Sequence, residues 1–154
     1  MPAADTERQL RAARLDLAAG AYRQALDALE RIAAPTAEQD AHRLILAGQC
    51  HEKLDDAGRA AEAYDRAHAL DPGLHVAVLR QGVLRYHRGD LDAARRLLYR
   101  YVQLEPGNPE AFCYLALCEP DTSRRSAFAG RVAVLDGPAG TWSRELLRAL
   151  PTDG

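Results

Sequence analysis

The chain has 154 residues, 47% hydrophobic and 27% charged, with a formal net charge of −2. That composition is typical of a globular protein long enough to bury its own core. It lacks the positive field with which a protein neutralises nucleic-acid phosphates, and no segment reaches the ~20 apolar residues of a membrane span. We therefore expect a cytoplasmic protein with no nucleic-acid partner and no membrane insertion.

The first helical pair is expected over residues 6–39. Gly20-Ala21-Tyr22 forms the turn between its two helices, because glycine at such a site allows the chain to reverse. Ala25, Leu29 and Ile32 then recur at helical spacing and mark the inner face of the second helix.

A second pair follows over 41–74, with Asp55-Asp56-Ala57-Gly58 as its turn. Pro72 ends its second helix, because proline has no N–H to donate. Large and small residues recur at helical spacing on its inner face: Leu44, Gly48, His51, Ala60, Tyr64 and Ala67.

A third copy occupies 75–108, 34 residues after the second. Asp71-Pro72-Gly73 returns as Glu105-Pro106-Gly107, and Gly48 returns as Gly82. Glycine costs about 1 kcal/mol relative to alanine within a helix. Its recurrence predicts that the neighbouring helix approaches too closely at these positions for a Cβ.

A fourth, partial copy is expected over 109–135, with Asn108 as N-cap and Pro109 at the first helical position. Its later part, Ser123 to Leu135, also reads as a helix. Thr141 is expected to cap a last helix over 141–150, in which Trp142 anchors the end of the array.

These residues at a 34-residue period resemble the tetratricopeptide repeat, most closely over 41–108. The resemblance implies an all-α fold, a right-handed superhelix of stacked antiparallel helix pairs. It divides a single domain, 1–154, into about three and a half repeats and a capping helix. The expected boundaries are 6–39, 41–74, 75–108, 109–135 and 141–150.

The resemblance also implies that the first helix of each pair lines a concave groove, which holds a peptide or helix of another protein. Spacing assigns these residues to the groove: Glu7, Leu10, Arg14, Leu17, His42, Ile45, Gln49, Glu52, Val76, Leu79, Val83, Tyr86, Glu110, Cys113, Tyr114 and Leu117.

Five of these residues would form a solvent-facing hydrophobic trough, a surface typical of interaction sites: Leu79, Val83, Tyr86, Tyr114 and Leu117. Two alternatives stay open. In the first, the assignment of faces is shifted by one helical position and some of these residues belong to the core. In the second, the helix around Trp142 folds back and fills the trough.

Some members of the family clamp the acidic C-terminus of heat-shock chaperones with lysine, asparagine and arginine. The corresponding positions in this chain hold Leu10, Arg14, Leu46, Val76 and Arg80. Only Arg80 agrees with that pattern, so a carboxylate clamp is not expected, and Arg80 is kept as a groove residue.

No catalytic constellation is present in the sequence. Its five histidines lack the spacing of a helical zinc motif, and no glycine-rich phosphate loop occurs. Cys50, Cys113 and Cys118 indicate buried free thiols of a reducing compartment. We therefore predict no enzyme, no metal and no cofactor.

The predicted function is binding of a partner protein, as an adaptor or assembly factor. A first alternative is a chaperone of bacterial type III secretion translocators, whose length and repeat number are similar. A second is a self-assembling scaffold, in which the groove closes on another copy to form a homo-oligomer.

Overall fold

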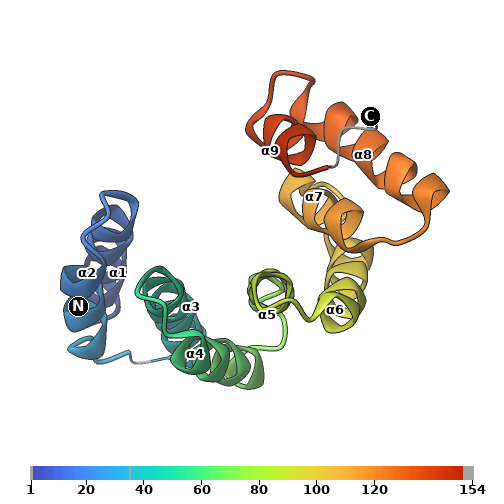
Figure 1. Cartoon of the computed structure of the whole chain (residues 1–154). Coiled ribbons are helices and arrows are strands. Elements are labelled where there is room, and N and C mark those ends of the chain that lie inside the picture. Colours follow the sequence, from blue (N-terminus) through green and yellow to red (C-terminus); the bar gives the residue numbers. More distant parts are fainter. Residues whose placement is uncertain (1, 35, 151–154) are drawn as a thin grey trace. The chain divides into compact units, whose positions relative to one another are not determined.

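A computed structural model describes residues 2–34 and 36–150, which form nine helices and no strand (Figure 1). The helices are α1 (Pro2–Ala18), α2 (Tyr22–Glu30), α3 (Ala37–Lys53), α4 (Ala57–Leu70), α5 (Val76–His87), α6 (Leu91–Leu104), α7 (Pro109–Cys118), α8 (Thr122–Asp136) and α9 (Thr141–Ala149). The all-α class predicted from the sequence is confirmed, and within the described residues no helix has the length and apolar character that crossing a bilayer requires.

The chain divides into two compact units, residues 1–80 and 81–154, and the boundary falls within α5. In the first unit α1 packs on α2, α3 packs on α4, and α3 also contacts both α1 and α2. A core of leucines, isoleucine, alanines and a cysteine joins α1, α2 and α3: Leu10, Ala13, Ala25, Leu29, Ile32, Leu46, Ala47 and Cys50.

In the second unit α7 packs on α6 and on α8. The predicted partial repeat therefore contains both helices of a pair, α7 and α8. The last helix, α9, packs on α7 and α8, as α3 packs on α1 and α2. It thus takes the place of a further first helix in the second unit.

Short polar side chains cap most of the helices, because the first backbone N–H groups of a helix have no partner within it. Thr36 accepts from the N–H of Gln39 at 3.1 Å, and Asn108 accepts from that of Glu110 at 2.9 Å. Asp56, Asp90 and Asp121 cap α4, α6 and α8 in the same way. The predicted turn at 55–58 is therefore shorter than expected, since α4 already begins at Ala57.

The two recurring glycines lie where helices approach most closely. A Cβ on Gly82 would lie 2.8 Å from Cγ of Leu98, and one on Gly48 would overlap the ring of Tyr64. Tyr64 is fully buried, and its hydroxyl donates a hydrogen bond to Glu52. The predicted reason for these glycines is confirmed.

The cap of α9 differs from the prediction. The first residue of that helix is Thr141, and no side chain at the N-cap position, Gly140, bonds to the helix. Instead the Asp136 carboxylate accepts from the N–H groups of Trp142 and Ser143 at 2.8 and 3.0 Å. A carboxylate at the end of α8 therefore satisfies the start of α9 and holds the two helices together.

Candidate functional site

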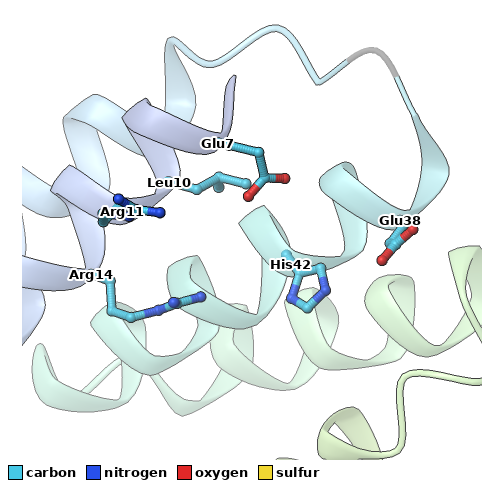
Figure 2. Close-up of a pocket in the computed structure, with 6 residues that line it drawn as sticks. All are labelled: Glu7, Leu10, Arg11, Arg14, Glu38 and His42. Atoms are coloured by element: carbon cyan, nitrogen blue, oxygen red, sulfur yellow. The ribbon is translucent and has the colours of Figure 1, made fainter. Parts of the chain in front are cut away.

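The first unit contains a hollow between α1 and α3 of about 190 Å³, which we name the polar hollow. Its lining residues are Glu7, Leu10, Arg11, Arg14, Glu38 and His42 (Figure 2). Arg14 extends from α1 towards His42 on α3, while Glu38 lies on the far side of that histidine. The hollow therefore presents charges of both signs side by side.

Local contacts fix one end of the polar hollow. The Gln39 amide donates to the carboxylate of Glu7 at 3.3 Å and to the backbone oxygen of Ala3 at 3.3 Å. Both bonds join α3 to α1, so the backbone beneath the hollow is held at a fixed spacing. Arg11 and Arg14 are exposed, and their guanidinium groups are available for a ligand.

The second unit contains a hollow of about 170 Å³, which we name the aromatic hollow. Residues from α5, α7 and α9 line it: Tyr86, His87, Cys113, Tyr114, Leu117, Trp142, Glu145 and Ala149. Every lining residue of both hollows belongs to α1, α3, α5, α7 or α9, and none to the second helix of a pair.

Four of the lining rings contact one another. The Tyr86 and Tyr114 centroids lie 5.1 Å apart, and Tyr114 lies 6.0 Å from Trp142. His87 contacts both tyrosines, at 5.3 and 5.7 Å. The planes of neighbouring rings meet at 57 to 79°, so the rings form walls facing different directions and not a single stack.

One of the residues that line the aromatic hollow, Cys113, is a buried thiol. Burial is the main cause that raises the pKa of Cys113 to about 12, and the nearby carboxylates of Glu145, Glu110 and Asp136 contribute to the same rise. Burial also raises the pKa values of Cys50 and Cys118, to about 11. All three cysteines are buried and unpaired by disulfides, as predicted, and each is a neutral thiol at physiological pH.

The structure divides the predicted groove residues into three groups. Glu7, Leu10, Arg14 and His42 line the polar hollow, and Tyr86, Cys113, Tyr114 and Leu117 line the aromatic hollow. The other predicted groove residues line neither hollow: Leu17, Ile45, Gln49, Glu52, Val76, Leu79, Arg80, Val83 and Glu110.

The expectation that Leu79 and Val83 face solvent is wrong. Their exposed fractions are 2% and 3%, and Ile45 is buried too. A step of one residue turns a helix by about 100°, so the spacing that marks the inner face does not separate it from the flank that a neighbouring helix covers. The first alternative weighed from the sequence, a shifted face, applies to Leu79 and Val83.

The second alternative, in which the helix around Trp142 fills the trough, applies in part. Trp142 on α9 contacts Tyr114, so α9 covers part of the α7 face that the trough was expected to offer. The aromatic hollow persists beside it. Trp142 is thus both an anchor of α9, as predicted, and a wall of the hollow.

Six of the lining residues are not among the predicted groove residues: Arg11, Glu38, His87, Trp142, Glu145 and Ala149. Arg11 stands four residues after Glu7, and Glu38 four before His42, so each shares a helix face with a residue already assigned. That four-residue spacing is the signal in α1 and α3 by which Arg11 and Glu38 could have been found. No comparable signal placed α9 beside α5 and α7. Among the described residues no cluster of three or more histidine, cysteine or acidic side chains could hold a metal ion.

The helix pairs and the hollows along their first helices define the fold of this chain as that of a tetratricopeptide-repeat protein. Solved structures with the same fold include MamA, at 17% identity, with a TM-score of 0.69 over 86% of this chain and 74% of MamA. The second TPR domain of human RPAP3, in complex with the HSP70 peptide SGPTIEEVD, is 21% identical, with a TM-score of 0.67 over 79% of this chain and all of that domain.

The C-terminal part of a TPR repeat-containing protein from Cytophaga hutchinsonii is also similar, at 16% identity and a TM-score of 0.63, over 96% of this chain and 60% of that one. No family model matches the sequence.

Among curated proteins, the peptidyl-prolyl cis-trans isomerase FKBP4 of Mus musculus and that of Rattus norvegicus are each 33% identical over 94 residues. The match covers 58% of this chain. The chain spans about a fifth (20%) of the length of those relatives. A match over so small a share does not carry the activity of the whole protein to this chain.

Proposed function

We propose that this chain is a non-enzymatic interaction module that binds a segment of another protein along its first helices, as an adaptor or assembly factor. One observation carries the proposal: in each unit the hollow is lined by first helices alone. Hollows with a few convergent polar groups are the usual places for a ligand. The RPAP3 domain, which has the same fold, is in complex with a peptide.

The chemistry of the residues that line the hollows favours binding of a peptide over catalysis. The polar hollow offers exposed arginines and carboxylates, and the aromatic hollow offers tyrosines and a tryptophan, which provide contact area at a low entropic cost. The Cys113 thiol that lines the aromatic hollow is neutral, and a neutral thiol is a poor nucleophile.

The test is a pull-down from lysate of the source organism, with bound proteins identified by mass spectrometry. The wild type is compared with Arg14→Glu in the polar hollow and Tyr114→Leu in the aromatic hollow. Arg100→Glu, on the exposed side of α6, is the matched control on a second helix. Circular dichroism first establishes that each variant is folded.

A protein captured by the wild type and by Arg100→Glu, but lost with either hollow variant, supports the proposal. Equal capture by all four proteins overturns it, because the partner then binds outside both hollows. Capture of the chain's own copies alone favours the self-assembling scaffold. Capture of a secreted translocator favours the type III secretion chaperone.

A further inference from the structure

The aromatic hollow differs from an ordinary apolar docking site in the charge of its surroundings. Among the described residues that line it, Glu145 is the one with a formal charge at neutral pH, and none is lysine or arginine. The polar hollow, in contrast, is lined by two arginines. The two hollows thus select for different chemistry.

The carboxylates around Cys113 agree with this difference in charge between the two hollows. The carboxylates of Glu145, Glu110 and Asp136 all oppose ionisation of the thiol of Cys113, which lines the hollow. Three acidic groups from α7, α8 and α9 therefore impose a negative potential where Cys113 lies. That potential favours a cation and disfavours an anion.

The ring geometry is suited to a cation as well. Aromatic faces attract ammonium and guanidinium groups through their quadrupoles, most strongly at tryptophan and tyrosine. Tyr86, Tyr114 and Trp142 meet at steep angles and surround a hollow of about 170 Å³. This is roughly ten times the space that a single water needs, and it accommodates a charged head group with part of its methylene stem.

We infer that the aromatic hollow takes a cationic side chain, arginine or lysine, from the partner segment. The inference rests on the proposed function and specifies what the partner must carry. The head group lies against the rings of Tyr114 and Trp142, and Glu145 supplies the counter-charge. Glu145 already accepts from Arg148 on the same helix through Oε1 at 3.0 Å. Because that pair is exposed, an incoming cation can share the carboxylate at little cost.

The sequence contains one tryptophan, Trp142, so its indole N–H gives a single NMR signal that reports on the hollow. The probes are two blocked tripeptides, acetyl-Gly-Arg-Gly-amide and the same peptide with citrulline. Citrulline has nearly the shape of arginine without its charge. We expect a saturable shift of the indole signal with the arginine peptide and a much weaker one with the citrulline peptide.

Three variants complete the test. Glu145→Gln and Tyr114→Leu should each weaken binding of the arginine peptide by about two- to fivefold, as expected for an exposed ion pair or cation–π contact. Leu147→Gln, on the exposed side of α9 (71% exposed), should leave it unchanged. Glu145→Gln alters an exposed residue, so its result does not depend on the folding of Tyr114→Leu.

Equal shifts with both peptides, or no saturable shift with the arginine peptide, would overturn the inference. Failure of this inference can be distinguished from failure of the proposed function. If a partner is captured through the hollows but binds Glu145→Gln as tightly as the wild type, the interaction module stands and the cationic side chain does not.

Discussion

Gly48 and Gly130 both lie within helices, but their surroundings are opposite. A Cβ on Gly48 would overlap the Tyr64 ring, whereas one on Gly130 meets nothing within 4 Å. We expect Gly48→Ala to lower the free energy of unfolding by about 1–3 kcal/mol through overpacking. Gly130→Ala should raise it by up to about 1 kcal/mol through helix propensity. Urea unfolding followed by circular dichroism measures both, and a Gly48→Ala protein as stable as the wild type would contradict the packing of α3 on α4.

Leu79 provides a test of the corrected groove. Because its side chain is almost fully buried, Leu79→Glu should place a carboxylate in the core and lower the free energy of unfolding by about 3 kcal/mol or more. Leu147→Glu, on an exposed position, should change it by no more than about 0.5 kcal/mol. If Leu79→Glu unfolds at the same urea concentration as the wild type, Leu79 faces solvent after all.

The buried thiols predict a loss of stability in alkali. In the unfolded chain each thiol has its ordinary pKa of 9.0, and in the folded chain burial raises the pKa values to about 11 for Cys50 and about 12 for Cys113. The unfolded state therefore loses these protons first as the pH rises. The thiol contribution to stability is complete below pH 9 and is lost as the pH rises to the folded-state values, by at most about 1.4 kcal/mol per pH unit for each thiol.

Urea unfolding at a series of pH values measures this slope. Tyr64, whose pKa burial also raises, contributes in the same direction, so a variant is needed to isolate a thiol. Cys113→Ala should lose stability less steeply above pH 9 than the wild type. Parallel slopes would show that Cys113 does not ionise on unfolding in this range.

At the scale of the element, α9 depends on a residue of α8. Asp136 satisfies two N–H groups of α9, and the Ser143 hydroxyl donates to the backbone oxygen of Gly137 at 2.7 Å. Asp136→Ala should weaken the docking of α9 by about 0.5–2 kcal/mol, the usual range for loss of a cap. Fluorescence of Trp142 should move to longer wavelength as the indole becomes more exposed.

Ser126→Ala, at an exposed position of α8, is the control for this change. It should leave the Trp142 emission unaltered. If Asp136→Ala also leaves the emission unaltered, the carboxylate does not hold α9 in place, and the aromatic hollow owes its third wall to packing alone.

The elements themselves follow closely from local sequence. Pro109 after Asn108, the aspartates before α4, α6 and α8, and the glycines at the turns are local signals, and α7 begins where they predict. The start of α9 does not follow from its own sequence, because Asp136 caps it from the end of another helix. A signal that depends on two helices meeting is not present in either one alone.

At the scale of the whole molecule, the proposed module and the self-assembling scaffold differ in mass. We expect the mass from multi-angle light scattering to stay at 16.9 kDa as the concentration rises, because the proposal assigns the hollows to a different protein. A mass that rises with concentration and returns to the monomer value in Tyr114→Leu would favour the scaffold and contradict the proposal.

The sequence determined the helices, their 34-residue period and the two close approaches at Gly48 and Gly82, since periodicity, caps and missing side chains are local properties. Only the tertiary structure decided which side of each first helix remains accessible. Burial depends on what a neighbouring helix covers, and a rotation of one residue exchanges core for surface. For that reason Tyr86 and Tyr114 line a hollow, Leu79 and Val83 are buried, and Trp142 meets its aromatic neighbours from a distant part of the chain.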